Sequence, residues 1–269
     1  MPLAVCATPI GNLRDVTLRV LDELAAAELV LCEDTRRTRI LLDRHGLSAR
    51  LLSYHEHNEA ARTAELLPQL EAGVRVALVS DAGLPGVSDP GARLIAASLE
   101  RGVPVTVLPG ASSVETALVA SGFASERYQF LGYLPRGRAA VAAVWDELRR
   151  WPWPAVAFES PKRLPRTLAS LAGALPERPV AVCRELTKQF EEVVRGSASL
   201  LAERFAEPPK GEITLVFGPS EQPQHTEEDP QALGAVDELV SAGVARRQAA
   251  DLVARLTGMS RNELYRQSL

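Results

Sequence analysis

The chain has 269 residues, of which 46% are hydrophobic, and its formal net charge at pH 7 is −4. This composition is typical of a globular protein with a sizeable core, and it excludes the strongly basic class of nucleic-acid-binding proteins. No stretch approaches the roughly 20 consecutive apolar residues of a membrane helix, and the N-terminal segment has no basic leader. We therefore expect a cytoplasmic protein that has no membrane partner.

The first half of the chain alternates short apolar runs with segments of helical periodicity. Strands are predicted at residues 3–7, 29–32, 50–53, 74–79 and 103–108. Helices are predicted at residues 17–27, 38–45, 60–72, 92–100 and 114–120. Because this alternation is typical of βα units, it predicts a parallel sheet with helices on both faces.

A second unit is predicted because the pattern changes near residue 125, which divides a domain of residues 1–125 from one of residues 126–220. Its strands are predicted at residues 128–134, 155–158, 180–184, 192–195 and 212–217, and its helices at 139–150, 164–172 and 198–205. Residues 221–230 have the polar composition of a linker. Residues 231–269 form a small helical segment, either a helix-turn-helix variant that binds nucleic acid or a plain appendage.

The loop from Ser80 to Gly91 is the richest local signal. It follows an apolar run, holds three glycines and two prolines in twelve residues, and includes Asp81 and Asp89. Such a backbone lets a ligand approach the main chain closely. In parallel sheets, ligands bind beyond the carboxyl ends of the strands, where this loop is expected to lie.

Other predicted strands also end in polar residues, namely Thr8, Glu33, Asp34, His55, His57, Ser112 and Ser113. No G-x-G-x-x-G or G-x-x-x-x-G-K-[ST] motif follows the first strand, which disfavours a conventional dinucleotide or triphosphate site. His55, His57 and Glu59 have no third metal ligand at local spacing, so no metal site is predicted. The three isolated cysteines are expected to be reduced core thiols.

Basic residues gather in two stretches despite the acidic net charge. Residues 134–166 include seven basic and three acidic side chains. The segment after Ser241 includes five basic and two acidic side chains. Each stretch is either a nucleic-acid contact or an ordinary solvated helix face.

Eight segments together resemble one family. They are residues 8–13 (TPIGNL), 33–36 (EDTR), 55–59 (HEHNE), 80–91 (SDAGLPGVSDPG), 109–112 (PGAS), 158–161 (FESP), 184–188 (RELTK) and 210–212 (KGE). In this order and spacing they resemble the tetrapyrrole methylase superfamily. Within it, they are most similar to the bacterial enzymes that methylate a cytidine 2′-hydroxyl in 16S ribosomal RNA of the small subunit.

The resemblance implies two α/β domains with a cleft between them that binds S-adenosylmethionine, and it implies a homodimer. The matching motifs give the cofactor-binding residues of the first domain as Thr8, Pro9, Asp81, Ala82, Gly83, Ser112 and Ser113. Those of the second domain are Arg184, Glu185, Leu186, Gly211, Glu212 and Ile213. The family chemistry requires no metal.

Methyl transfer to a ribose hydroxyl requires alignment and a place for the proton. Asp34, Glu159 and Glu185 are candidate proton acceptors, between which the sequence does not decide. Lys188 is a candidate for stabilising the developing alkoxide or binding phosphate. The candidate RNA-binding residues are Arg36, Arg136, Arg138, Lys162, Arg163, Arg246 and Arg247.

Two other functions stay open at this point. One is methylation of a small tetrapyrrole, whose carboxylates would meet the basic residues near Arg136. The other is a non-catalytic module that binds a nucleoside or RNA. The helices after residue 231 favour a macromolecular substrate.

Overall fold

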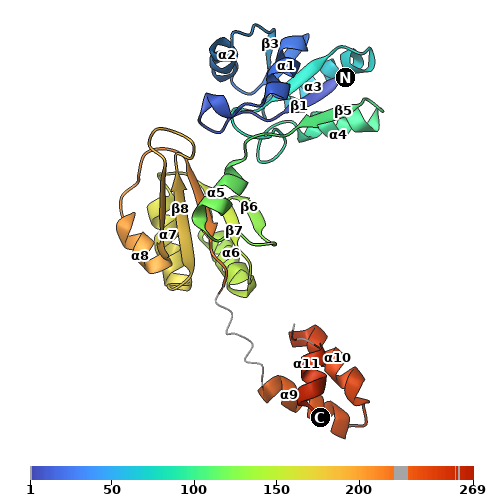
Figure 1. Cartoon of the computed structure of the whole chain (residues 1–269), viewed down its shortest axis with the longest axis vertical. Helices are drawn as coiled ribbons and strands as arrows, with labels where there is room; N and C mark the ends of the chain where they lie inside the picture. Colours follow the sequence, from blue (N-terminus) through green and yellow to red (C-terminus); the bar gives the residue numbers. More distant parts are fainter. Residues whose placement is uncertain (1, 221–229, 258, 260) are drawn as a thin grey trace. The chain divides into compact units, whose positions relative to one another are not determined.

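The computed structural model describes residues 2–220, 230–257, 259 and 261–269. The chain divides into two compact units, Met1–Ser220 and Glu221–Leu269, which are described separately (Figure 1). None of the helices in these described ranges combines the length and the apolar character needed to cross a membrane.

The first unit begins with a five-stranded sheet of order β3-β2-β4-β1-β5. Its strands are β1 (Leu3–Cys6), β2 (Leu29–Cys32), β3 (Leu51–Ser53), β4 (Val76–Val79) and β5 (Val105–Leu108). All neighbouring strands are parallel. The continuous apolar runs of β1, β2 and β4 are buried on both faces, as parallel strands covered by helices require. The predicted parallel sheet is confirmed.

Helices cover both faces of this sheet. On one face, α1 (Leu18–Ala26) and α2 (Thr35–Arg44) bury Val20, Leu24 and Leu42, after a short 3₁₀ turn at Leu13–Asp15. On the other face lie α3 (Glu59–Glu71) and α4 (Ala92–Glu100), which bury Leu66 and Leu94. The helix expected from residue 38 begins at Thr35, because the Asp34 side chain accepts the Arg36 N–H and caps it.

The second sheet has the order β6-β7-β10-β8-β9 and is mixed. Its strands are β6 (Gln129–Tyr133), β7 (Ala155–Glu159), β8 (Pro179–Arg184), β9 (Glu192–Ser197) and β10 (Ile213–Phe217). Only β6 and β7 are parallel, since the pairs β7–β10, β10–β8 and β8–β9 are antiparallel. One face is covered by α6 (Arg138–Arg150), α7 (Leu164–Ala174) and α8 (Ala198–Arg204).

The other face of the second sheet is covered by α5 (Ser113–Ser121), which precedes that sheet in the chain. Ala117 and Leu118 of α5 pack with Val156, Ala181 and Val216. The domain boundary at residue 125 stays a prediction, but α5 belongs by packing to the second sheet. It therefore joins the two sheets of this unit.

The second unit is a bundle of α9 (Pro230–Ser241), α10 (Arg246–Thr257) and α11 (Arg261–Gln267). Its core includes Val236, Ala250, Val253 and Leu264. The helices predicted after residue 231 are confirmed. The linker predicted at residues 221–230 lies outside the described residues, apart from Pro230, which begins α9.

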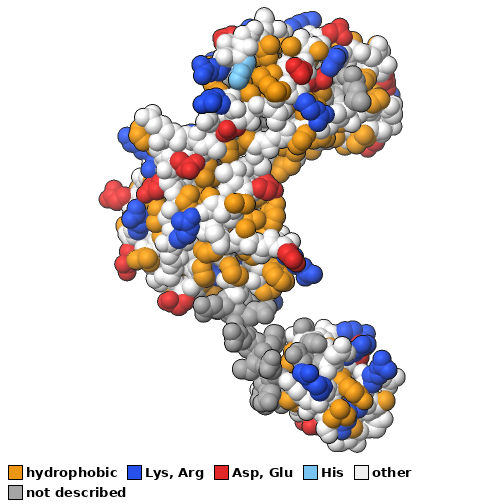
Figure 2. Space-filling model, in the orientation of Figure 1, with side chains coloured by type: hydrophobic (Ala, Val, Ile, Leu, Met, Phe, Trp, Pro, Cys, Tyr) orange, Lys and Arg blue, Asp and Glu red, His pale blue; other side chains and the backbone are white. Residues whose placement is uncertain are grey.

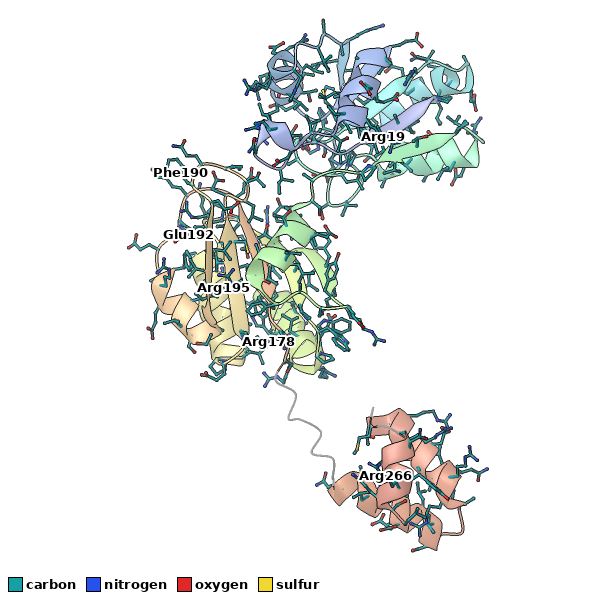
Figure 3. All side chains as sticks on the ribbon, in the orientation of Figure 1. Arg19, Arg178, Phe190, Glu192, Arg195 and Arg266 are labelled. Carbon is teal, nitrogen blue, oxygen red and sulfur yellow. The ribbon has the colours of Figure 1, made fainter. Side chains whose placement is uncertain are left out.

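The Arg178 side chain donates hydrogen bonds to carbonyl groups at the end of α6 and in the turn that leads to β7 (Figure 3). The residue is 5% exposed, and burial lowers its pKa to about 10. Its Nη1 donates to the Leu148 carbonyl at 2.9 Å, and its Nη2 lies 3.3 Å from the Trp151 and 3.4 Å from the Trp153 carbonyl oxygens. A cation at the C-terminal end of α6 also suits the dipole of that helix.

Replacing Arg178 with methionine should lower the free energy of unfolding by about 3 kcal/mol, because buried carbonyls lose a charged donor. Urea unfolding followed by tryptophan fluorescence tests this, since the three tryptophans, at 145, 151 and 153, all lie in or beside α6. The control is Arg149→Met, which removes an exposed side chain that donates to one carbonyl. Equal urea midpoints for the two variants would contradict this role.

Candidate active site

The loops after β1 and β4 meet at the centre of the first sheet. From β1 the chain leads to β2 on one side, and from β4 it leads to β5 on the other, so ligands are expected between these strands. Thr8 and Gly83 exchange two backbone hydrogen bonds of 2.8 and 3.0 Å. The Thr8 hydroxyl donates to the Ser80 carbonyl at 3.0 Å. The structure thus brings together two predicted cofactor-binding motifs.

The loop from Ser80 to Gly91 has a fixed shape. Gly83 and Gly91 have φ values of +78° and +132°, and a Cβ on Gly91 would stand 2.8 Å from a Leu78 methyl group. Glu59 of α3 accepts the Gly91 N–H at 3.2 Å and the Arg93 N–H at 3.3 Å. The loop therefore requires glycine at these positions and is anchored at its end by a neighbouring helix.

A cavity of about 830 Å³ is bounded by this loop, by the loop after β5 and by the ends of β6, β7 and β10 in the second sheet. Its walls hold six acidic residues, Glu33, Asp81, Asp89, Glu115, Glu159 and Glu212. Arg37 is the one basic residue among the lining side chains, all of which lie in the described range 2–220, and its guanidinium lies 3.5 Å from Asp81. Figure 2 shows a concave surface between the lobes that carry the two sheets. The cavity suits a ligand that carries positive charge.

The cavity lining includes predicted residues from both domains, namely Asp81, Ala82, Gly83, Ser112, Ser113, Glu159, Glu212 and Ile213. A smaller pocket of about 240 Å³ shares Asp81, Ala82 and Glu212, and adds the predicted residues Thr8, Pro9 and Lys188. Five of the predicted cofactor-binding and catalytic residues line neither space: Asp34, Arg184, Glu185, Leu186 and Gly211.

The Asp34 side chain caps the N-terminus of α2. Its two carboxylate oxygens accept the Arg36 N–H and guanidinium at 2.7 to 3.0 Å. Hydrogen bonds from the Arg36 side chain and backbone lower the pKa of Asp34 to about 2. These contacts favour a structural carboxylate over a proton acceptor.

Glu159 lies in the part of the cavity wall that the second sheet supplies, where it pairs with Arg163. The buried Glu159 carboxylate accepts the Thr167 hydroxyl at 2.6 Å and the Ser160 N–H at 2.7 Å, and lies 3.2 Å from Arg163 Nε. Arg163 Nη2 also donates to the carbonyls of Leu134 and Pro135. These contacts favour a structural role for both residues, so Arg163 has little freedom to bind RNA.

The loop after β8 contacts the loop after β1 and thereby joins the two halves of the site. The Asn12 N–H donates to the Thr187 hydroxyl at 3.0 Å, and a Cβ on Gly11 would stand 2.8 Å from the Leu186 carbonyl oxygen. Glu185 and Thr187 have φ values of +51° and +64°. Such strained residues often lie at functional sites.

Glu185, Lys188 and Glu212 form a closed network at this junction. Lys188 Nζ lies 3.0 Å from Glu185 and 2.9 Å from Glu212. The Glu212 N–H, with help from Lys188, holds the pKa of Glu185 below its usual value. Burial acts to lower the pKa of Lys188, but both carboxylates outweigh it and raise that pKa. Arg184 is similarly engaged by Glu192 and the Lys210 carbonyl.

One wall of the cavity is aromatic, which the sequence pattern does not predict. The Phe158 ring packs edge-on against Phe130 and Tyr133, with centroids 5.0 and 5.4 Å apart, and Tyr133 is 64% exposed. Strict alternation along β6 places Phe130 and Tyr133 on opposite faces. A register shift between them, with Gly132 at a φ of +65°, brings both rings to the cavity.

The other predicted RNA-binding residues remain on the surface. Arg136, Arg138, Lys162 and Arg247 are exposed. The Arg36 side chain is 88% exposed although it pairs with Asp34, and Arg246 pairs with Asp237. In the part of the chain that the structure describes, no cluster of three or more potential metal ligands is found, and the three cysteines are buried free thiols.

The chain is similar to known methyltransferases in sequence and in fold. It is 42% identical to the "Ribosomal RNA small subunit methyltransferase I" of Mesorhizobium japonicum, over 99% of this chain and 91% of the relative. The protein of the same description from Micromonospora olivasterospora is also 42% identical, over 98% of this chain and 85% of the relative.

Solved structures of similar fold include diphthine synthase, with a TM-score of 0.63, 14% identity and coverage of 80% of this chain and 89% of the other. The uroporphyrin-III C-methyltransferase of Thermus thermophilus, in complex with S-adenosylhomocysteine, has a TM-score of 0.56 and 20% identity, over 80% of this chain and 96% of the other. The family described as "Tetrapyrrole (Corrin/Porphyrin) Methylases" matches residues 2–202. The chain therefore belongs to the tetrapyrrole methylase family and is an S-adenosylmethionine-dependent methyltransferase, as its motifs predict.

Proposed function

We propose that the enzyme methylates the 2′-hydroxyl of a cytidine in 16S ribosomal RNA of the small subunit. The observation that carries this proposal is the extent of the match. The small-subunit RNA methyltransferases match 98 to 99% of this chain, which includes the C-terminal helices. The tetrapyrrole enzyme from Thermus thermophilus covers 80%. The additional helical unit suits a macromolecular substrate.

The larger cavity fits S-adenosylmethionine. Its volume is in the range of small-molecule sites, and Asp81, Ser112 and the backbone of the loop after β4 offer partners for the polar groups of the cofactor. The excess of carboxylates suits a sulfonium cation. Bound there, the cofactor supplies a methyl group already activated for transfer. Asp81 and Ser112 would hold it from the first domain, and Ile213 and Thr214 from the second.

The substrate phosphates must lie outside this acidic cavity, because carboxylates repel them. Arg36, Arg136, Arg138 and Lys162 are exposed and lie within a few residues of the cavity lining in sequence. We propose that these side chains bind the RNA backbone while one nucleoside enters the cavity beside Tyr133. Arg246 and Arg247 of the second unit would also contact phosphates of the RNA.

We also propose a homodimer that acts in the cytoplasm, where its ribosomal substrate is found. Large apolar side chains remain exposed on the first unit, including Val119 (69%), Phe190 (64%) and Leu200 (55%). Phe190 lies on the loop between β8 and β9 (Figure 3). A dimer interface would cover such groups.

The test is to incubate the purified protein with methyl-labelled S-adenosylmethionine and small ribosomal subunits that lack this modification. We expect label on a 2′-O-methylcytidine of 16S RNA after nuclease digestion and mass spectrometry. A labelled tetrapyrrole in a parallel reaction, without labelled RNA, would replace the proposal with small-molecule methylation. Cofactor binding without turnover of either substrate would indicate a binding module.

Asp81→Ala should weaken S-adenosylhomocysteine binding about tenfold or more, since Asp81 lines both spaces and accepts the Asp34 N–H at 3.0 Å. Calorimetry measures this change. Asp43→Ala, which removes an exposed carboxylate from α2, should bind normally. Normal affinity of a folded Asp81→Ala variant would remove this residue from the cofactor site.

Reversal of charge at Arg136 and Arg138, both to glutamate, should lower kcat/KM for the ribosomal subunit at least tenfold and leave S-adenosylhomocysteine affinity unchanged. The loss should shrink at higher salt, because phosphate contacts are screened. The matched control reverses Arg149 and Arg150, which are exposed at the other end of α6. If the two double variants lose activity equally, the RNA does not bind at Arg136 and Arg138.

A further inference from the structure

Methylation of a ribose hydroxyl releases a proton, which a carboxylate of the cavity can accept if its oxygens are not already bound by cations or hydrogen-bond donors. This inference rests on the proposed function. A general base needs an oxygen lone pair that no cation or cluster of donors already occupies. The six acidic residues of the larger cavity differ sharply in this respect.

Four of the six are engaged. Glu159 holds the Thr167 hydroxyl, the Ser160 N–H and Arg163. Glu212 pairs with Lys188, and Asp81 lies 3.5 Å from Arg37 while it accepts the Asp34 N–H. Glu115 accepts the hydroxyls of Ser112 and Tyr128. The oxygens of each of these carboxylates thus already contact a cation or hydrogen-bond donors, which leaves them less free to accept a proton from a substrate hydroxyl.

Asp89 and Glu33 are the two that remain, with no ion pair in the described structure. Asp89 is half-buried at the end of the loop from Ser80 to Gly91, and the nearby Ser80 hydroxyl, which donates to the Ala82 and Gly83 carbonyls, is the one group that acts to lower its pKa. Glu33 lies at the end of β2, where burial and then the charge of Asp81 raise its pKa, while Arg37 and His55 act to lower it. No such cation acts on the charge of Asp89, so we take Asp89 as the carboxylate less stabilised in its charged form.

The loop places Asp89 between both walls of the cavity. The preceding residue, Ser88, has a φ of +61°, and its hydroxyl oxygen lies 3.8 Å from where a Cβ on Gly132 of β6 would stand. Burial raises the pKa of the phenol of Tyr133, next along β6, and the charge of Asp89 raises it further, so the two side chains are close. Glu59 fixes the other end of the loop at Gly91. A nucleoside beside Tyr133 would thus meet the Asp89 carboxylate.

We propose that Asp89 is the catalytic proton acceptor of this methyltransferase. As the ribose oxygen forms its bond to the methyl carbon, the bond between that carbon and sulfur breaks, and its electron pair stays on sulfur. The hydroxyl proton passes to an Asp89 carboxylate oxygen and then to solvent. The atoms and charges balance without a metal or a further reactant.

The surroundings of Asp89 give this carboxylate a suitable basicity. Burial, followed by the charges of Glu33 and Asp81, raises the pKa of Asp89 to about 6. Tyr133 from β6 is close enough to be affected by the Asp89 charge, while Arg37 from α2 and His55 after β3 act on the neighbouring Glu33, and Arg37 also lies 3.5 Å from Asp81. A base with this pKa is deprotonated at neutral pH and still accepts a proton effectively.

The experiment compares single-turnover methylation of small ribosomal subunits by the wild type, Asp89→Asn and Glu33→Gln between pH 5 and 8. The wild-type rate should rise about tenfold per pH unit below about 6 and then level off. Asp89→Asn should lose about 100-fold or more and lose this rise, while S-adenosylhomocysteine affinity by calorimetry stays within about twofold. Glu33→Gln should retain the rise in rate but move it to lower pH, because the Glu33 charge helps to raise the pKa of Asp89.

A readout independent of activity comes from thermal unfolding. Because the folded-state pKa of Asp89 lies above the value of 3.8 for a free aspartate, its charge disfavours the folded state once the pH exceeds both values. Asp89→Asn should therefore raise Tm at pH 7.5 and leave it nearly unchanged at pH 4. A lower Tm at pH 7.5 would mean that Asp89 has a structural role, which would overturn the inference.

The outcomes separate the two proposals. An active wild type with an equally active Asp89→Asn variant overturns the inference alone. A wild type that binds cofactor but methylates no RNA overturns the proposed function and, with it, this assignment. Loss of the pH rise in Glu33→Gln but not in Asp89→Asn assigns the proton to Glu33 instead.

Discussion

The loop after β1 is held on two sides, and the site depends on this arrangement. Thr8 exchanges backbone hydrogen bonds with Gly83, while Asn12 donates to Thr187 and Gly11 leaves no room for a side chain against Leu186. The first contact belongs to the parallel sheet and the second reaches the mixed sheet. The first contact joins two backbones, and the second joins a backbone N–H to a short side chain, so together they limit how far the cavity walls can separate.

Charge divides the molecule into regions with different tasks. The cavity is acidic and suits a sulfonium, but it repels the phosphates of the RNA that we propose as substrate. Exposed arginine and lysine side chains near the cavity, such as Arg136 and Lys162, would bind those phosphates. The overall net charge of −4 therefore gives little information about RNA binding, since the relevant charges are local.

Much of the fold could be predicted because apolar runs and helical periodicity are local properties of the sequence. The roles of the side chains could not be predicted in this way, because they depend on contacts between residues that are distant in sequence. Asp34 looked like a free group at a strand end, yet it caps α2. Tyr133 reaches the cavity through a register shift that alternation does not reveal. The sequence places Asp89 in the glycine-rich loop, but it does not show that the neighbouring Asp81 and Glu212 have basic partners and Asp89 has none in the described structure.

We propose that the larger cavity holds the cofactor and that a nucleoside beside Asp89 receives its methyl group. A crystal structure of the enzyme with S-adenosylhomocysteine tests it most directly. We expect ligand density in contact with Asp81, Ser112 and Thr214, with the sulfur facing the space between Asp89 and Tyr133. Density confined to the smaller pocket beside Pro9 and Ile40 would contradict it.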